Sequence, residues 1–373
     1  MYESGDNEEA IKKYKFVLEK NPTHVKALNG LGNSYKFSGD LNSAIKMYDK
    51  AIKLKPDYSE AIMNQAFAYL AQQNFAEGWW RYEHRLKNKQ ITLTRSPIPS
   101  QPQWAPGLGG RVFLWAEQGL GDVIMFASII PELHAVVDEL IIQIDGRLIE
   151  VFKRSFPSDI VYYSADEPVL EKVCDFQIPF GSLPRYFRAD LNSFQKTSLG
   201  YLKSDRGRTA KLRKELLSDG RTHLIGLSWK GGAGLNAGIK SLDLSKIVKS
   251  LPNKNVKFVN LQYGDTQQEC DDLKRNSGVE IHNIPGIDNR NDIDSLLSLI
   301  NACDHVVTIS NVTAHLAGSI GKNTSIMLAL SHDWRWGMGC SESYWYSSLK
   351  LYQQKKLDDW GQPLAKLKRE FHL

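Results

Sequence analysis

The sequence lacks the features that mark several large protein classes. It contains no apolar run of about 18 residues, so no membrane span is expected. The acidic start MYESGDNEEA has no apolar segment of the kind found in secretory signals. Cysteine is scarce, with 4 in 373 residues, and no two cysteines share a C-x-x-C spacing, so neither a zinc site nor a disulfide framework is indicated. These absences favour a soluble protein of the reducing cytoplasm.

Charge of one sign is not concentrated in any block. The formal net charge is +5, which mildly favours anionic ligands and does not indicate nucleic acid. The nine histidines include no H-E-x-x-H motif and no G-x-S-x-G elbow is present, so two common hydrolase classes are unsupported. Asp292-Ile293-Asp294 is formally a D-x-D motif, but it opens a predicted helix, where acids are common, and we assign it no metal.

Residues 5 to 56 repeat with a period of 34. The matched pairs are Gly5 and Gly39, Asp6 and Asp40, Ala10 and Ala44, Tyr14 and Tyr48, and Pro22 and Pro56. Small and large positions coincide over a whole unit, which resembles the tetratricopeptide repeat. Gly32 and Ala44 should let paired helices approach closely. A third unit starts at Ser59 and degrades into WWRYEHRL, whose aromatic residues we interpret as the joint to the next domain.

Two interpretations of the repeats remain open. They form a concave groove that binds a polypeptide, or a scaffold through which copies of the chain assemble into a homo-oligomer. Two and a half repeats are marginal alone, because each unit buries its face only against neighbours. The chain also starts partway through a repeat, as a fragment of a longer protein would.

Beyond a linker rich in proline and glycine, apolar strands alternate with helices, which predicts parallel sheets covered by helices. The predicted strands are 111–118, 139–145, 159–164, 222–229, 256–264, 305–311 and the run NTSIMLAL. We expect helical repeats in 1–88, the linker in 89–110, a first lobe in 111–215, a second lobe in 216–345 and a helical tail in 346–373.

The segment Gln118-Gly119-Leu120-Gly121-Asp122 follows the first predicted strand. Ligands bind at the carboxyl ends of strands in open parallel sheets. Gly119 and Gly121 permit a tight turn and close approach of a ligand, so with Gln118 they form a candidate acceptor loop. Asp122 falls at a helix start, where it either caps the helix or acts as a general base. The sequence leaves both roles open.

One loop of the second lobe has the composition of a phosphate site. It carries Lys230, Gly231 and Gly232 and is followed by Lys240. Free backbone amides together with a lysine suit an anionic oxygen. We therefore predict that a phosphate group binds there.

A second candidate loop for phosphate is Ser310-Asn311-Val312-Thr313-Ala314-His315. Asn311 is a predicted N-cap, and the helix start presents unpaired amides at the positive end of the dipole. The alternative is simple capping by Asn311 and Thr313, with His315 a packed helix residue. For the segment DWRWGMGCSESYWYSSL, the alternatives are packing at a domain seam or a cleft lined by Trp334, Arg335 or Tyr344.

Four blocks in this order carry a family resemblance: WAEQGLGDVIMFASIIPEL, SWKGG with KSLDL, ISNVTAHLAGSIGK, and DWRWGMGCSESYWYSSLKLYQQ. They resemble the bacterial tetratricopeptide-repeat glycosyltransferases, whose catalytic part is similar to ADP-heptose lipopolysaccharide heptosyltransferases. The resemblance covers essentially the whole chain. It implies tetratricopeptide helical repeats followed by a GT-B fold of two Rossmann-like α/β lobes.

The resemblance also implies the chemistry. The donor substrate is a nucleotide-diphosphate sugar held mainly by the second lobe, and no metal or other cofactor is needed. Asp122 is the implied base and Lys240 lies near the donor phosphates, with Lys230 a weaker candidate. Thr313 and His315 fall in the block that meets the donor nucleotide. Many relatives have Asp-Thr where this chain has Ser310-Asn311, which puts in doubt a carboxylate holding a ribose or sugar hydroxyl.

The layout is also similar to O-GlcNAc transferase, which makes a protein hydroxyl, presented by the repeat groove, the expected acceptor. Two other functions stay open. One is a lipopolysaccharide or glycan heptosyltransferase-like enzyme whose repeats serve only assembly. The other is a non-catalytic scaffold that binds a nucleotide sugar.

Overall fold

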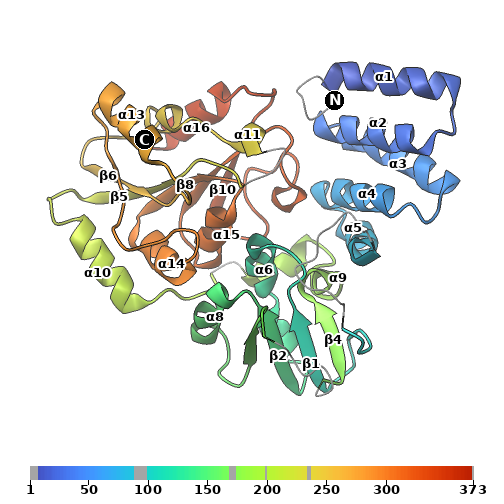
Figure 1. The fold of residues 1–373 in the computed structure, drawn as a ribbon, viewed down its shortest axis with the longest axis horizontal. Coiled ribbons are helices and arrows are strands. Elements are labelled where there is room, and N and C mark those ends of the chain that lie inside the picture. The colour runs from blue at the N-terminus through green and yellow to red at the C-terminus, as the bar shows by residue number, and fades with distance from the viewer. Residues whose placement is uncertain (1–6, 88–98, 168–173, 198–199, 233–236, 372–373) are drawn as a thin grey trace.

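The computed structural model describes residues 7–87, 99–167, 174–197, 200–232 and 237–371. They form a helical arm and two lobes, each built on a parallel sheet (Figure 1). The predicted fold class, helical repeats followed by two Rossmann-like α/β lobes, is confirmed. Within the described ranges, no helix has both the length and the apolar character needed to cross a membrane.

The arm comprises α1 (Asn7–Lys20), α2 (Val25–Phe37), α3 (Leu41–Leu54), α4 (Ser59–Ala71), α5 (Phe75–Tyr82) and the 3-10 helix η2 (Glu83–Lys87). Asp40 caps α3 by accepting a hydrogen bond from the amide of Ser43. A Cβ at Gly32 would lie 2.5 Å from the Tyr48 ring, so only glycine lets α2 and α3 pack this closely. The predicted close approach at Gly32 is therefore confirmed.

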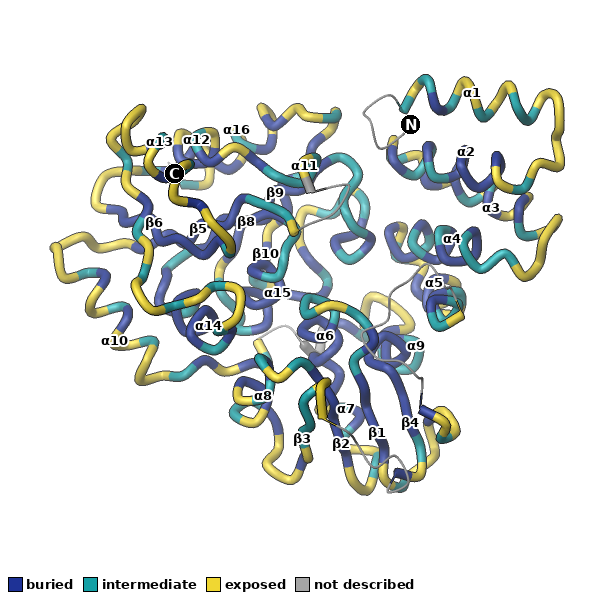
Figure 2. The backbone as a smooth tube through the Cα atoms, in the orientation of Figure 1, coloured by how far each residue is buried: buried dark blue, intermediate teal, exposed yellow. Residues whose placement is uncertain are grey.

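The first lobe has a four-stranded sheet in the order β3-β2-β1-β4, with all pairs parallel. Its strands are β1 (Arg111–Trp115), β2 (Glu139–Ile144), β3 (Val161–Ser164) and β4 (Phe176–Pro179). Its helices are α6 (Leu120–Ala127), α7 (Ile130–His134), η3 (Gly146–Leu148), α8 (Ile149–Ser155), η5 (Phe180–Ser182), α9 (Pro184–Phe187) and η6 (Leu191–Thr197). The strand interiors are buried, as continuous apolar runs such as VFLW and LIIQI require (Figure 2).

The second lobe has a six-stranded parallel sheet in the order β10-β9-β8-β5-β6-β7. Its strands are β5 (His223–Ser228), β6 (Val256–Asn260), β7 (Ile281–His282), β8 (His305–Ile309), β9 (Thr324–Leu328) and β10 (Leu349–Gln353). Its helices are α10 (Arg206–Leu216), α11 (Ala237–Lys240), α12 (Leu244–Val248), α13 (Gln267–Ser277), α14 (Ile293–Ala302), α15 (Val312–Ser319), η7 (Trp334–Trp336) and α16 (Gly361–Phe371).

Two expectations about the lobes need correction. The expected helical tail 346–373 contains β10, which pairs with β9, so it is helical only in α16. Leu349 and Leu351 are buried and Lys350 between them is exposed, which is the alternation of a strand. Helix α10 falls almost wholly within the expected first lobe, 111–215, yet it packs on α14 of the second, where Arg213 Nη1 donates to Ala302 O at 2.7 Å. Of the expected linker 89–110, residues up to 98 lie outside the described part.

Aromatic rings join the arm to both lobes in what we call the aromatic junction. Its members are Phe67, Phe75, Trp79, Tyr82, Phe126, Phe194, Trp334, Tyr344 and Trp345. Trp79 is central, with ring centroids 6.4 Å from Phe126 of the first lobe and 5.4 Å from Trp334 of the second. The interpretation of this segment as a joint holds for Trp79 and Tyr82 and is wrong for Trp80, which is 66% exposed.

Candidate functional site

The carboxyl ends of the two sheets meet at the turn that follows β1. Gly119 is the N-cap of α6, and Asp122 lies in the first turn of that helix. A Cβ at Gly121 would come within 3.0 Å of the His315 ring, so the turn of the first lobe lies directly against α15 of the second. Asp122 does not cap the helix, and its side chain points to the second lobe instead.

The partner of Asp122 is Arg335 of η7. Arg335 Nε donates to Asp122 Oδ1 at 2.6 Å, its Nη2 contacts the same oxygen, and its Nη1 pairs with Asp333. Within the described ranges, Asp122 Oδ2 accepts no hydrogen bond. Burial raises the pKa of Asp122, and the attraction of Arg335 opposes that shift. The result is a carboxylate with one oxygen held in place and the other available to accept a proton.

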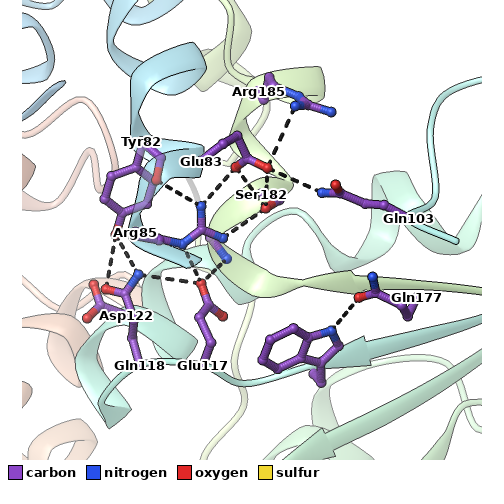
Figure 3. Close-up of polar contacts among 12 residues, drawn as sticks. Tyr82, Glu83, Arg85, Gln103, Glu117, Gln118, Asp122, Gln177, Ser182 and Arg185 are labelled. Atoms are coloured by element: carbon purple, nitrogen blue, oxygen red, sulfur yellow. Dashed lines mark hydrogen bonds and ion pairs between the residues drawn. The ribbon is translucent and has the colours of Figure 1, made fainter. Parts of the chain in front are cut away.

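The arm supports the turn that carries this carboxylate (Figure 3). Tyr82 of α5 accepts a hydrogen bond from Gln118 Nε2 at 2.6 Å, so this candidate acceptor-loop residue is tied to the arm. Arg85 of η2, whose side chain is fully buried, donates from Nε to Glu117 Oε1 at 3.0 Å. The same oxygen accepts from the Gly181 amide at 2.9 Å. Arm and first lobe therefore share one buried polar network beside Asp122.

The first predicted phosphate loop is partly occupied by the protein's own groups. Lys230 Nζ pairs with Glu269 at 2.6 Å, and its amide donates to Gln262 Oε1 at 2.8 Å. The Gly231 amide donates to Ser241 Oγ at 3.2 Å. Gly232 follows at the edge of the described residues. The Lys230 ammonium is therefore engaged by a carboxylate of α13.

The second loop forms the start of α15. Asn311 caps the helix by accepting from the Ala314 amide, and its Nδ2 donates to Ser228 Oγ at 2.8 Å. Thr313 is buried and donates to the same Ser228 oxygen at 3.4 Å, while Ser310 accepts from Trp336 Nε1 at 2.8 Å. The capping role of Asn311 is confirmed. The first amides of α15 still lack intrahelical acceptors, as at every helix start.

His315 is buried where the two lobes touch. Its ring stacks on Trp336 with centroids 5.0 Å apart, and Nδ1 lies 2.9 Å from the Tyr346 hydroxyl. Burial, and to a smaller extent the nearby Arg335, lowers the pKa of His315 to about 3. His315 is therefore a neutral imidazole at physiological pH.

We expect acidification from pH 6.5 to 5 to lower the melting temperature, and His315→Gln to reduce that loss. In the folded protein, His315 stays neutral above its pKa of about 3. In the unfolded chain a histidine takes up a proton near pH 6.5, so the unfolded state binds more protons and is favoured as the pH falls. One such group changes the free energy of unfolding by up to ~1.4 kcal/mol per pH unit.

Thermal melts at pH 7 and pH 5 measure this effect. His223→Gln is the matched control, because it makes the same substitution at an exposed histidine. An equal loss of melting temperature in wild type and His315→Gln would contradict the prediction.

A polar pocket of 460 Å³ lies beyond the carboxyl ends of β6 and β7. Its lining includes Asn260, Gln262, Asp265, Asn283, Asn289 and Arg290. We call it the amide pocket. Gln262 lines this pocket and accepts from the Lys230 amide, so the pocket and the Lys230 loop are neighbours. The volume is within the range of small-molecule sites. The amide pocket was not predicted, although asparagine and glutamine side chains at strand ends were a signal for it.

A second pocket, of 230 Å³, lies between the arm and the second lobe. We call it the arm pocket. The second lobe contributes Lys240, Asp333 and Arg335, and the arm contributes Lys36 and Phe67. Lys240 thus shares a pocket with the residue that holds Asp122. The contribution of the arm to this pocket was not predicted, because a lysine on a repeat helix has the same sequence pattern as any solvated residue.

No group of three His, Cys, Asp or Glu side chains that could hold a metal ion occurs in the part of the chain that the structure describes. Both carboxylates of the D-x-D motif have protein partners. Asp292 caps α14, and Asp294 pairs with Arg154 at 2.7 Å and Arg208 at 3.3 Å. The Arg154 pair also links the first lobe to the second.

The chain is similar to several known proteins. The tetratricopeptide repeat family model matches residues 25–58, which confirms the repeat predicted from its period. The chain is 29% identical over 416 positions to protein FlbA of Caulobacter vibrioides, covering 96% of this chain and 69% of that protein.

Two solved structures of the predicted types are also similar. One is ADP-heptose lipopolysaccharide heptosyltransferase II of E. coli, with a TM-score of 0.48 and 12% identity over 70% of this chain and 97% of that one. The other is a Thermobaculum terrenum O-GlcNAc transferase mutant, with a TM-score of 0.32 and 14% identity. This match covers 100% of this chain and 90% of that one.

Proposed function

We propose that this chain is a GT-B glycosyltransferase that moves a sugar from a nucleotide-diphosphate sugar to an acceptor hydroxyl. One observation carries the proposal. Asp122 of the first lobe, whose side chain is 16% exposed, faces the second lobe with one oxygen held by Arg335, and its other oxygen accepts no hydrogen bond from the described residues. Arg335 lines the same pocket as Lys240. In this proposal Asp122 of the first lobe is the proton acceptor and Lys240 of the second lobe is the cation that meets the leaving group.

The donor would lie along the carboxyl ends of the second sheet. The nucleoside fits the amide pocket, whose side chains offer both donors and acceptors to a base and a ribose. The diphosphate would lie between Lys240, the Gly231 and Gly232 loop and the amides of Val312 and Thr313. In this proposal lysine and helix amides stabilise the diphosphate charge, and no metal is needed.

The chemical step follows from this placement. The unpaired Asp122 Oδ2 takes the proton of the acceptor hydroxyl as its oxygen bonds to the anomeric carbon. The bond from that carbon to the diphosphate oxygen breaks, and the diphosphate leaves with the electron pair. Burial raises the pKa of Asp122, which makes it a better base than an exposed aspartate, while Arg335 keeps it ionised before the proton arrives.

The proposed acceptor is a hydroxyl on a polypeptide bound by the arm. A row of polar side chains crosses α2 and α4 toward the arm pocket: Asn64 Nδ2 donates to Asn29 Oδ1 at 3.2 Å, and Asn29 Nδ2 donates to Glu60 at 2.8 Å. Lys36 Nζ, at 3.5 Å from Asn64 Oδ1, ends the row at the pocket. Asn29 is buried and holds the row in place, and the partly exposed Asn64 can bond the backbone of an extended segment.

We expect Lys240→Ala to weaken nucleotide binding by about tenfold, because it removes a charged hydrogen-bond partner of a phosphate. The experiment screens UDP, GDP, ADP, CDP and TDP for a rise in melting temperature of the wild type, because a bound ligand stabilises the folded state. The best nucleotide is then titrated calorimetrically into wild type and variant.

Lys254→Ala is the matched control, because Lys254 is exposed on the second lobe away from both pockets. A Lys240 variant that binds as well as the control would remove Lys240 from the site. If no nucleotide stabilises the wild type, the proposed function itself fails.

A further inference from the structure

The arm pocket has a defined place in the proposed reaction. Lys240, the proposed diphosphate ligand, lies on its lining together with Arg335, which holds the proposed base. A sugar in transfer must lie between the leaving diphosphate and the base. The arm pocket has a volume of 230 Å³, which is below the usual range for a whole ligand. It therefore suits one part of a ligand. This step rests on the proposed function.

The arm forms the opposite wall of that pocket. Leu41, Phe67 and Ala71 line it from α3 and α4. The wall is fixed to the second lobe: the Met338 amide donates to Ala71 O at 2.8 Å, and the Phe67 ring stacks on Trp334 with an interplanar angle of 7°. The arm side chains therefore have set positions relative to Lys240 and Arg335.

Lys36 is the charged group on this wall. Its Nζ lies 5.4 Å from the centre of the Phe67 ring, and its one hydrogen-bond partner among the described residues, Asn64 Oδ1, is at the long limit of 3.5 Å. Among the described residues no carboxylate lies within ion-pair distance of it. Burial lowers the pKa of Lys36 to about 8, and Asp333 opposes that shift. An ammonium in this position has donors left for a ligand.

We infer that the helical arm is one wall of the glycosyl subsite, and that Lys36 helps to select the donor by hydrogen-bonding an oxygen substituent of the transferred sugar. The arm then contributes to donor recognition as well as to acceptor binding. A lysine from α2 and one from the second lobe would grip the sugar and the diphosphate of the same molecule.

The test compares two probes on the full chain. Calorimetry first finds which of UDP, GDP, ADP, CDP and TDP binds the wild type. It then finds which ester of that nucleotide binds most tightly among those of glucose, galactose, mannose and their N-acetyl forms. Lys36→Met should weaken binding of the nucleotide sugar by about tenfold, which is the contribution of one hydrogen bond to a charged group. Binding of the free nucleoside diphosphate should be unchanged. Lys36→Arg should retain most of the affinity for the sugar ester.

Lys26→Met is the matched control, because Lys26 is exposed on the same helix α2. Melting curves of all variants check that the arm still packs. Equal changes for both probes, or no change for either, would overturn the role of Lys36 while leaving the proposed function intact. Failure of the wild type to bind any probe would instead remove the proposed function, and this inference with it.

Discussion

Asp122→Asn should lower the rate of glycosyl transfer by about 10² to 10⁴-fold while the affinity for the nucleoside diphosphate stays unchanged. A positioned general base contributes a factor of that size, and asparagine cannot take up the acceptor proton. Asn keeps the shape of the side chain and an oxygen for Arg335, so the turn should persist. The measurement is transfer of labelled sugar at saturating donor, with calorimetric titration of the nucleotide.

The variant also weakens a partly buried ion pair, so a matched control is needed. Glu132→Gln breaks a comparable pair in the first lobe, where Arg188 Nη2 meets Glu132 and the arginine side chain is fully buried. Glu132 lies in α7 and lines neither of the two pockets described, so its variant should lose stability and keep transfer activity. Normal turnover by Asp122→Asn, with the protein folded, would show that Asp122 is not the base.

Arg85→Met should destabilise the protein by about 3–5 kcal/mol, the largest loss that we expect from a single substitution. Arg85 is fully buried and its guanidinium contacts Glu117, Glu83 and Ser182. Removing it leaves Glu117, which is 1% exposed, as a buried carboxylate without its cation, and burial already raises the pKa of Glu117. Calorimetric melting should show the loss as a lower unfolding temperature.

Two further variants separate the buried charge from the packing. Arg81→Met removes a more exposed ion pair with Glu77 on α5, and such pairs contribute about 1 kcal/mol or less. In the double variant Arg85→Met with Glu117→Leu no carboxylate remains at position 117, and much of the stability should return. If Arg85→Met melts like Arg81→Met, the buried network does not hold the arm to the first lobe.

Periodicity made most of the fold predictable. The period of 34 gives the paired helices, because Gly32 must face Tyr48 for the pair to close. Continuous apolar runs gave the buried strands β1, β2, β5, β6, β8 and β9 within a few residues. The edge strand β10 was missed because Tyr and Trp residues before it dominated the pattern, and a seam of aromatic rings has no fixed period.

The candidate site was predictable only where a backbone rule applies. Ligands bind beyond the carboxyl ends of parallel strands, and this rule locates the turn with Asp122 and the helix start at Asn311. No such rule pairs Asp122 with Arg335, which lies 213 positions away. The same holds for Lys36, which reaches the pocket only because the aromatic junction sets the angle of the arm. Long-range contacts of this kind depend on tertiary packing.

The aromatic junction has a consequence for how this molecule can move. Trp79 contacts Phe126 in the first lobe and Trp345 in the second, and its indole N–H donates to Arg188 O at 2.7 Å. A rigid rotation that separates the lobes must pull this ring away from at least one of them and expose it to water. The arm therefore acts as a brace that holds the two lobes at a fixed angle to each other.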